Sequence, residues 1–404
     1  MRKYYTHIVL IILALVLYFM ANFQRVAIPG AVFDILHSEL SLKAPEITAL
    51  SAIFMYSYAI SLLFCGILVD RYGPVKVILC GALLFTLGSI IFPNTDNLYF
   101  LYFSRGLLGF GAATFYLSLV QEAKKCFPDK YFSISVSLML ITGYVGGFFA
   151  NAPFICLTEF FHWQTILNAL AIITLVVTLL FCFERGFLHH IPVNEHVKFS
   201  IQPFKEVFSK QFNRNLFMFG ALNYGLYYVI QTVLGVKFLK DFVKFSDVQA
   251  STILSIMIVI AGFSGVLLAS LSTKFNKRVI FMKTICIMFA IVFALISLCL
   301  IFNFNTPLIA FLLMLVAVGG GMSPLLIPII HATNKYEVRA TALSIMNSCF
   351  FVAVGLFGSL IGILIDVFPA VNSIYTKNSY LLIFATFFIF SLIEMYNVFK
   401  LKDV

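Results

Sequence analysis

Long apolar runs, each about the length that crosses a lipid bilayer, constrain this chain more than any other feature. A transmembrane helix needs about 20 mostly apolar residues. Of the 404 residues, 61% are hydrophobic and only 11% are charged, whereas soluble domains contain about 25% charged residues. These values exclude a soluble globular enzyme, a disordered chain, a fibrous protein and a nucleic-acid-binding module. The sequence predicts an all-α membrane protein.

Short polar segments separate the apolar runs, which predict twelve transmembrane helices. The first six cover 7–37, 46–69, 76–95, 98–124, 130–157 and 162–183. The second six cover 213–241, 247–272, 278–302, 306–332, 337–366 and 378–400. The predicted domains are therefore an N-terminal six-helix half at 1–183, a cytoplasmic linker loop at 184–212 and a C-terminal six-helix half at 213–404.

Lysine and arginine are distributed unevenly between the two sides of the predicted bundle. With the N-terminus inside, about 20 of them fall on one side and about five on the other. Because positive charge favours the cytoplasmic side, both termini and the 184–212 loop are predicted to be cytoplasmic. We expect a multi-pass protein of a bacterial inner membrane. The lysines at 237–244 conflict locally with this orientation.

The eight cysteines are scattered along the chain and contain no CxxC pair. This spacing predicts neither a disulfide framework nor a metal site. We expect no cofactor, no bound metal and no enzymatic chemistry.

One internal echo supports a plan of two related halves. The segment 66–79 follows the second predicted helix, and the segment 271–281 follows the eighth, in the equivalent place. Thr273 stands where Asp70 would be, and Asn276 stands where Gly73 would be. Asn is the usual substitute for Gly at a left-handed backbone position. Transporters with repeated halves often bind their solute between the halves, near the middle of the membrane.

The segment Gly66-Ile67-Leu68-Val69-Asp70-Arg71-Tyr72-Gly73 resembles the signature between helices two and three of the major facilitator superfamily. The resemblance implies a transporter fold in which this loop acts in gating. We expect close helix packing at the first glycine, a carboxylate facing a helix N-terminus and a tight turn at the second glycine. Pro74 and Val75 depart from the family, which usually has more basic residues there. The predicted gating residues are Gly66, Asp70, Arg71, Gly73, Lys76 and Glu122.

A second resemblance lies on the predicted fourth helix. Arg105-Gly106-Leu107-Leu108-Gly109-Phe110-Gly111 is similar to the R-x-x-x-G motif of the same superfamily. It implies that Arg105 belongs to the translocation path and to proton coupling, with glycines that let helices approach closely. The alternative is an arginine that extends to the outer interface. On helix ten, Gly319 to Gly321 with two following prolines predict a bend or a break.

Arg25, on the first predicted helix, is the most informative charge. A charge in the centre of a membrane costs about 2.5–3.5 kcal/mol, and Arg does not lose its proton. Its guanidinium matches a carboxylate or phosphate in bidentate fashion. Asn22 lies beside it, and Pro29 can kink the helix. The alternatives are extension outward or a structural pair. Since no carboxylate lies plainly at mid-membrane, the cavity is predicted to be net positive and to favour anions.

Polar and aromatic groups on path-lining helices complete the prediction. Asn223 and Gln231, eight residues apart, are expected to share a helix face. Asp34, near the outer mouth, is the best titratable group. The predicted substrate-binding residues are Arg25, Asn22, Tyr56, Arg105, Tyr116, Asn223, Tyr227, Gln231 and Asn347, and the predicted proton-coupling residues are Asp34 and Arg105.

The sequence therefore predicts a secondary transporter that works by alternating access. Its solute would bear a carboxylate or phosphate, as an amino acid, peptide, organic acid or sugar phosphate does, and uptake would be coupled to protons. The alternative is an exporter of a drug or of a siderophore-like polycarboxylate, although the glycine-rich fifth helix lacks the Gly-Pro pair of drug antiporters. A solute sensor built on a transporter fold is a third possibility. The expected partners are the solute, protons and lipid, with no nucleic acid, and we expect a monomer.

Overall fold

The computed structural model describes residues 2–186, 200–304, 307–368, 370 and 374–403. Residues 187–199 of the predicted 184–212 linker lie outside the described residues. Contacts divide the chain into two compact units. Unit 1 contains Met1–Val26 and Ile53–Ser200, and unit 2 contains Ala27–Ala52 and Ile201–Val404. The boundary near residue 200 falls inside the predicted linker. Residues 27–52 are part of unit 2, whereas the prediction places them in the N-terminal half.

The described residues of unit 1 are helical, and their longest helices correspond to the predicted spans. The elements are α1 (Arg2–Ala27), α3 (Ala44–Tyr72), α4 (Pro74–Ile91), η2 (Phe92–Asn94), α5 (Leu98–Cys126), α6 (Asp129–Phe149), α7 (Ala152–Thr158) and α8 (Trp163–Arg185). The end of α1 and the start of α3 belong to unit 2.

Unit 2 begins with two short elements and continues with the helices of the second half of the chain. Its elements are η1 (Gly30–Val32), α2 (Phe33–Glu39), α9 (Gln202–Ser209), α10 (Gln211–Val229), η3 (Ile230–Leu234), α11 (Gly235–Phe238), η4 (Leu239–Val243), α12 (Asp247–Phe275), α13 (Arg278–Ile301), α14 (Leu308–Gly320), α15 (Ser323–Thr333), η5 (Tyr336–Val338), α16 (Arg339–Ile365) and α17 (Lys377–Phe399). The described part of the chain contains no strand, so the all-α prediction is confirmed.

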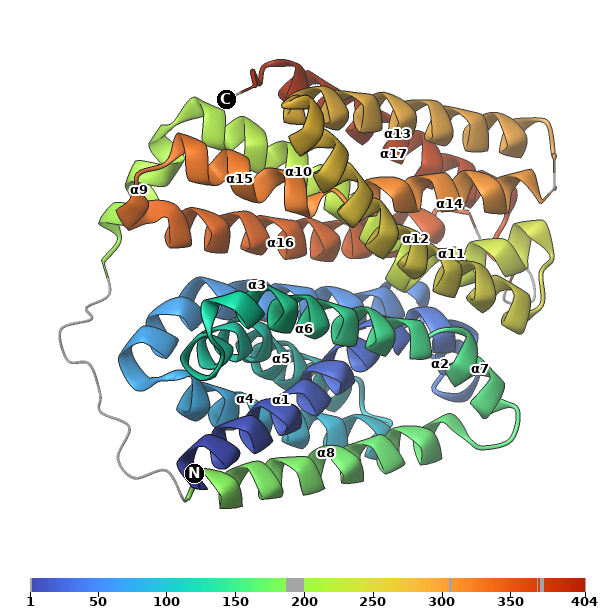
Figure 1. Ribbon diagram of the computed structural model, residues 1–404. Helices are drawn as coiled ribbons and strands as arrows, with labels where there is room; N and C mark the ends of the chain where they lie inside the picture. The colour runs from blue at the N-terminus through green and yellow to red at the C-terminus, as the bar shows by residue number, and fades with distance from the viewer. Residues whose placement is uncertain (1, 187–199, 305–306, 369, 371–373, 404) are drawn as a thin grey trace. The chain divides into compact units, whose positions relative to one another are not determined.

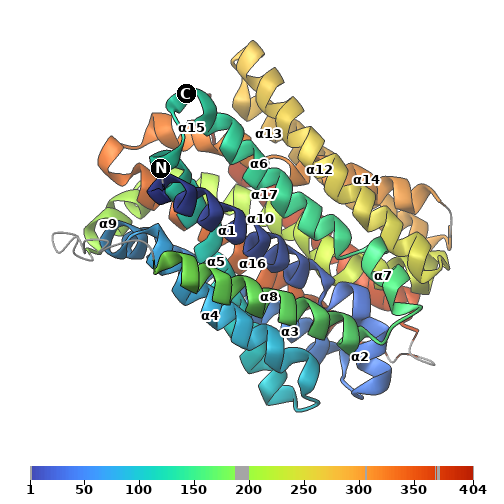
Figure 2. The ribbon, with the colours of Figure 1, turned by 60° about the horizontal axis from the view of Figure 1, so that its bottom comes forward.

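Glycines let the helices of unit 1 pack closely. Helix α4 packs against both α5 and α8, as Figure 2 shows. A Cβ atom on Gly111 would lie 2.4 Å from the backbone oxygen of Gly81, and one on Gly109 would lie 2.4 Å from that of Phe54. Any larger residue would force the backbones apart, so close packing at these two positions is confirmed. A Cβ on Gly66 would meet only Leu117, at 3.8 Å. The close packing predicted for Gly66 is therefore absent from this structure.

In unit 2, α10 packs against α15, α16 and α17, and α13 packs against α14 and α17. Figure 1 shows α10, α15 and α16 side by side, and Figure 2 shows α12 beside α14. The segment 27–52 joins this unit through close backbone contacts. A Cβ on Gly30 would lie 2.7 Å from the backbone oxygen of Thr232, and one on Gly362 would lie 2.1 Å from the hydroxyl of Thr48.

Helix ends follow local chemistry. Asn97 accepts hydrogen bonds from two backbone N–H groups and begins α5, and Ser246 with Gln249 forms a capping box at α12. Gly73 joins α3 to α4 with φ 81°, a conformation that side chains disfavour. Asn276 ends α12 with φ 51° and ψ 40°. The left-handed position predicted from the 66–79 and 271–281 echo is confirmed.

Four of the predicted helices are interrupted. The first ends at Ala27, two residues before Pro29, about ten residues earlier than predicted, because a proline lacks an N–H and restricts the residue before it. The fifth breaks after Ala150, ahead of Pro153. The tenth breaks near Gly321, ahead of Pro324, as predicted. Among the described residues, eleven helices are long and apolar enough to span a membrane.

The seventh predicted helix, 213–241, is not among those eleven. Helix α10 begins with polar residues, and the chain then passes through two π-helical turns, η3 and η4, which flank the short α11. π-turns are rare and are frequently found at functional sites. The segment ends at Lys244, whose φ is 65°.

Candidate functional site

Arg25 lies in the last turn of α1, and not at the centre of a helix as predicted. Its Nη2 atom donates a hydrogen bond to the Asn22 side-chain oxygen. Its guanidinium lies 5.8 Å from the centre of the Tyr58 ring. The side chain is half-buried. A cation in the last turn also interacts favourably with the helix dipole, so part of the role of Arg25 is local to α1.

Arg105 is completely buried in unit 1. Its Nη1 atom donates to the backbone oxygen of Gln24 at 3.0 Å. The guanidinium lies 4.7 Å from the centre of the Phe54 ring and 5.9 Å from that of Phe92. Such cation–π contacts are strongest where water is absent. The side chain does not extend to an interface, and this geometry favours helix packing over the substrate and proton roles predicted for Arg105.

Two tyrosines predicted to line the path are half-buried in unit 1. The Tyr116 ring lies 5.6 Å from that of Tyr18, and Tyr18 is the residue whose backbone oxygen accepts a hydrogen bond from Asn22 at 2.8 Å. Tyr116 is therefore linked to Arg25 through Tyr18 and Asn22. Tyr56, on α3, is the other half-buried tyrosine of the prediction.

Most of the predicted gating residues lie at the turn between α3 and α4. Asp70 and Arg71 are exposed, and Lys76 is half-buried. The Arg71 guanidinium lies 5.3 Å from the centre of the Tyr72 ring. Glu122 is buried at the end of α5, where its partners come from α1 and α5.

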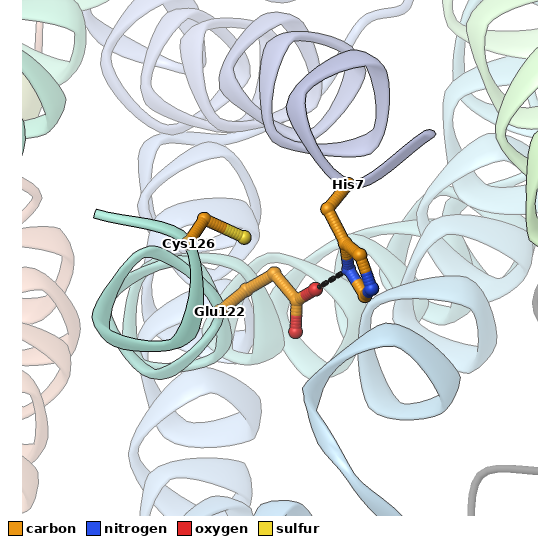
Figure 3. A group of neighbouring side chains, drawn as sticks. All are labelled: His7, Glu122 and Cys126. Atoms are coloured by element: carbon orange, nitrogen blue, oxygen red, sulfur yellow. Dashed lines mark hydrogen bonds and ion pairs between the residues drawn. The ribbon is translucent and has the colours of Figure 1, made fainter. Parts of the chain in front are cut away.

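Glu122, His7 and Cys126 form a compact cluster, shown in Figure 3. His7 Nδ1 makes a hydrogen bond with Glu122 Oε1, and Lys125 Nζ lies 3.8 Å from Oε2. The potential ligand atoms of the three residues lie within 4.8 Å of one another. A metal ion would have to displace the histidine from the carboxylate and compete with the lysine. The arrangement therefore fits an ion-pair cluster that joins the start of α1 to the end of α5.

A small pocket of about 10 Å³, room for about one water molecule, lies within unit 2. Its polar lining comes from Asn223 and Tyr224 of α10 and from Ser323 at the start of α15. Glycine and aromatic residues form most of the remaining wall, including Gly320 at the break of the predicted tenth helix. Of the residues predicted to bind substrate, Asn223 is the one that lines this pocket.

Glu394, on α17, lies directly behind Asn223 and is completely buried. Asn223 Nδ2 donates to Glu394 Oε1 at 3.0 Å, and Cys286 Sγ donates to the same oxygen at 3.2 Å. The other oxygen, Oε2, is buried and has no hydrogen-bond partner among the residues that the structure describes. This carboxyl group is therefore held by two neutral donors.

The remaining predicted residues of unit 2 are divided among different surroundings. Gln231 is buried in η3 and donates to the backbone oxygen of Leu254, on α12, at 3.1 Å. Asn223 and Gln231 therefore contact different helices, α17 and α12, although they were expected to share a face. Tyr227 is buried against Gly320. Asn347, on α16, is exposed.

A cluster of charges in unit 2 contains Asp34 and the lysines that conflicted with the predicted orientation. Lys237 Nζ lies 2.7 Å from Asp34 Oδ1 and 2.9 Å from Asp241 Oδ1. Lys240 forms ion pairs with both Asp34 and Asp247. We call these five side chains the charge cluster. The lysines have acidic partners here, and this pairing accounts for their presence on the side of the bundle that has few basic residues.

Asp241 is the most fully bound member of the charge cluster. Besides Lys237, it accepts hydrogen bonds from the Tyr380 hydroxyl at 2.7 Å and from the Tyr375 backbone N–H at 2.9 Å. Its side chain is 4% exposed, as is that of Lys237. Burial beside the carboxylates raises the pKa of the Tyr375 hydroxyl above its usual range, so this tyrosine stays neutral next to the acids.

Asp34 is held in its ionised form. Burial alone would raise the pKa of Asp34, but the charges and hydrogen bonds of Lys237 and Lys240 outweigh burial and hold that pKa below its usual range. A carboxylate that is clamped between two ammonium groups is a poor proton carrier. The geometry therefore argues against the proton-coupling role predicted for Asp34 and favours a structural one.

Sequence reasoning did not select Lys237, Asp241 or Glu394. A signal was present for the first two, since a Lys and an Asp four residues apart on an otherwise apolar helix can pair. Glu394 gave no comparable signal. It lies five residues before the end of α17, where a carboxylate is expected to face the membrane interface. Its burial depends instead on contacts with α10 and α13.

Comparisons with known proteins agree with this architecture. The family model described as Major Facilitator Superfamily matches residues 10–358. The solved structure of the nucleoside transporter NupG, as a point mutant, has a TM-score of 0.76 and 15% identity, and the match covers 98% of this chain and 99% of that one. A bacterial homolog of the human lysosomal transporter Spinster, inward-facing and unoccupied, has a TM-score of 0.73 and 16% identity, with 98% and 96% covered.

A D-xylose-proton symporter has a TM-score of 0.74 and 13% identity, and the match covers 98% of each chain. No curated protein matches the sequence. At these identities the likenesses to solved structures show the shared fold alone.

Proposed function

Because the chain belongs to the major facilitator superfamily and is a multi-pass secondary transporter with no enzymatic activity, we propose that it takes up a small metabolite bearing a carboxylate or a phosphate. Uptake proceeds by alternating access and is coupled to protons. The solute is an amino acid or short peptide, an organic acid or a sugar phosphate. The protein acts as a monomer in a bacterial inner membrane, with both termini in the cytoplasm.

The observation that supports an anionic group on the solute is the placement of Arg25. Asn22 and Tyr58 orient its guanidinium, and the side chain remains partly exposed. A guanidinium group that is already oriented loses little conformational entropy when it binds a carboxylate or phosphate. Tyr116 and Tyr56 supply hydroxyl groups in the same unit, and Asn223, Tyr227, Gln231 and Asn347 supply polar groups in unit 2.

Two of the three buried acids in the described part of the chain, Asp241 and Glu122, support the same choice, whereas the third, Glu394, has neutral hydrogen-bond partners. Asp241 is paired with Lys237, and Glu122 is bound by His7 with Lys125 nearby. A carrier of organic cations needs a carboxylate that can accept its substrate, and these two carboxylates already have cationic partners. The proton symporter that shares this fold gives separate support to proton coupling.

A neutral polar solute is the second candidate, because the polar groups of the pocket in unit 2 are uncharged. Two transporters with the same fold are named for a nucleoside and for D-xylose. The experiment must therefore include neutral solutes of both kinds beside anions.

The test is a thermal-shift screen of the purified protein in detergent against alanine, citrate, glucose phosphate, uridine, D-xylose and a lipophilic cation. A ligand at about 100 times its dissociation constant stabilises the folded state by about 2.7 kcal/mol. We expect a shift from a carboxylate or a phosphate that is lost in Arg25→Ala.

The matched control is Arg185→Ala, because Arg185 lies in the last turn of α8 as Arg25 lies in that of α1. The control variant should keep the shift. A shift from the lipophilic cation alone that persists in Arg25→Ala would replace this proposal with the drug-exporter alternative. A shift from uridine or D-xylose alone would replace it with the neutral-solute alternative.

A further inference from the structure

Glu394 lies inside the helix bundle of unit 2, away from the ends of its neighbours. Cys286, its partner on α13, comes eight residues after Arg278, about 12 Å along the helix at 1.5 Å per residue. Asn223, its partner on α10, comes twelve residues after Gln211, about 18 Å along that helix. The carboxyl group is completely buried, so it meets protein and not bulk water or lipid headgroups.

The surroundings of Glu394 do not compensate a full negative charge. Its two contacts, an amide and a thiol, are neutral donors to a single oxygen. A buried carboxylate without a counter-charge is very unfavourable and takes up a proton instead. The acid is therefore neutral at rest, with the proton on Oε2, the oxygen that has no partner in the described part of the chain.

Three basic side chains on the helices packed against α17 have other partners. On α13, the Lys283 ammonium lies 5.1 Å from the centre of the Phe399 ring, five residues beyond Glu394. On α10, Arg214 in the first turn donates to backbone oxygens of 208 and 209. On α16, Arg339 in the first turn donates to the backbone oxygen of Asn334. The titratable side chain that the structure places against Glu394 is the Cys286 thiol.

Asn223 connects this acid to the pocket. The same side chain lines the pocket of unit 2 and donates to Glu394 Oε1. An amide N–H bonds a carboxylate more strongly than it bonds a neutral acid. The strength of the hydrogen bond therefore depends on whether Glu394 carries its proton.

We propose that Glu394 is the intramembrane proton-binding site of this transporter and that Asn223, which lines the small pocket of unit 2, transmits the protonation state of Glu394 to the solute. The proposal deepens the proton coupling of the proposed function and rests on it. It does not depend on the charge of the solute.

The direction of coupling follows from the shared amide. The Asn223 amide nitrogen carries two N–H groups, and coupling arises when a solute acceptor draws this amide away from Glu394. The loss of that donor favours the neutral, proton-bound acid. Linkage makes the effect reciprocal, so proton binding at Glu394 releases the amide and strengthens solute binding. Proton and solute then bind together, as symport requires. The proton leaves when alternating access exposes the Glu394 carboxyl group to the other side of the membrane.

The first experiment measures the proton directly and needs no solute. Infrared spectroscopy of the purified protein in lipid vesicles at neutral pH should show the carbonyl band of a protonated carboxylic acid. The band should be absent in Glu394→Gln, which keeps the size of the side chain and an acceptor for both donors. In Asn223→Leu the band should disappear at a higher pH than in the wild type, because the carboxylate form of Glu394 loses a hydrogen-bond donor.

The matched control is Asp247→Asn, since Asp247 is an exposed acid of the same unit. This variant should keep the band. The proposal would be overturned if the spectra of the wild type and Glu394→Gln showed the same protonated-acid band. This outcome does not depend on the identity of the solute.

The second experiment measures coupling. Vesicles containing the protein receive radiolabelled alanine, citrate, glucose phosphate, uridine or D-xylose with or without an inward proton gradient. Glu394→Gln should still exchange the transported probe across the membrane but lose its proton-driven accumulation at least tenfold. Undiminished accumulation in this variant would refute the role of Glu394.

The two proposals fail separately. If uridine or D-xylose is the accumulated probe and accumulation depends on Glu394, the anion proposal fails and the proton site stands. If citrate or glucose phosphate is accumulated equally by the wild type and Glu394→Gln, the proton site fails and the anion proposal stands.

Discussion

Two buried carboxyl groups of unit 2, Asp241 and Glu394, are surrounded in opposite ways. Asp241 contacts the Lys237 ammonium and accepts from Tyr380 and from a backbone N–H. In the described part of the chain, Glu394 accepts hydrogen bonds from an amide and a thiol, both at one oxygen. The first group has a cationic partner, and the second has neutral partners. Burial alone therefore does not make an acid a proton carrier, because the neighbours decide which form is stable.

The largest expected effect comes from removing the counter-charge of Asp241. Lys237→Met leaves Asp241 buried without a cation, and breaking a buried pair from one side costs about 3–5 kcal/mol. We expect a large fall in the apparent melting temperature of the detergent-solubilised protein. Lys237→Met combined with Asp241→Asn should recover most of it, because the buried charge is gone while the amide oxygen still accepts from Tyr380. A single variant as stable as the wild type would contradict the comparison.

A smaller effect should appear in acid. The folded-state pKa of Asp34 is held below its usual range by Lys237 and Lys240, which overcome the effect of burial. Its contribution to stability is therefore complete above the unfolded-state pKa, about 3.9, and is lost as pH falls through the folded-state value. Melting curves should show that Asp34→Asn is less stable than the wild type at neutral pH and that the difference shrinks in acid. A difference independent of pH would show that the ion pairs contribute nothing.

The exposed side of the charge cluster should matter less. Asp247 is 55% exposed and pairs with Lys240, and exposed pairs contribute about 0–1 kcal/mol. Asp247→Asn should lower the melting temperature slightly in dilute buffer and leave it unchanged in high salt, where such pairs are screened. A loss as large as that of Lys237→Met would mean that the whole cluster acts as one buried network.

The smallest expected effect on stability is that of Glu394→Gln. A neutral acid and an amide have nearly the same shape, and the amide oxygen can accept from both Asn223 and Cys286. The melting temperature at neutral pH should therefore match that of the wild type. A loss like that of Lys237→Met would show that Glu394 is ionised at rest and would remove the contrast between the two acids.

The sequence predicted the parts of the fold that depend on local chemistry. Apolar runs located the long helices, and the echo between 66–79 and 271–281 placed a left-handed residue at Asn276, because backbone conformation there depends on the residue itself. Gly321 and the following prolines marked a real break. The early end of α1 was missed, although Pro29 was seen as a kink, and this error placed Arg25 too near the centre of its helix.

The candidate sites were harder to predict, because they depend on contacts between distant segments. Asp34 and Lys237 are about 200 residues apart in the chain, and neither shows its partner in its own neighbourhood. Arg105 was predicted to be a path residue from its resemblance to a family motif, whereas its guanidinium packs against Phe54 and Phe92. The burial of Glu394 follows from helix packing, which a pattern of mostly apolar faces does not specify.

The weak hydropathy of the seventh segment has a consequence for the order of events during synthesis. The segment contains Lys237, Lys240 and Asp241, and it is not among the helices apolar enough to span a membrane. Charged residues make the insertion of a helix costly, by up to about 2.5–3.5 kcal/mol each at its centre and by less near its end. Asp34, which pairs with Lys237 in the folded protein, is made about 200 residues earlier. The nascent chain thus brings its own counter-ion to the insertion of its most polar helix.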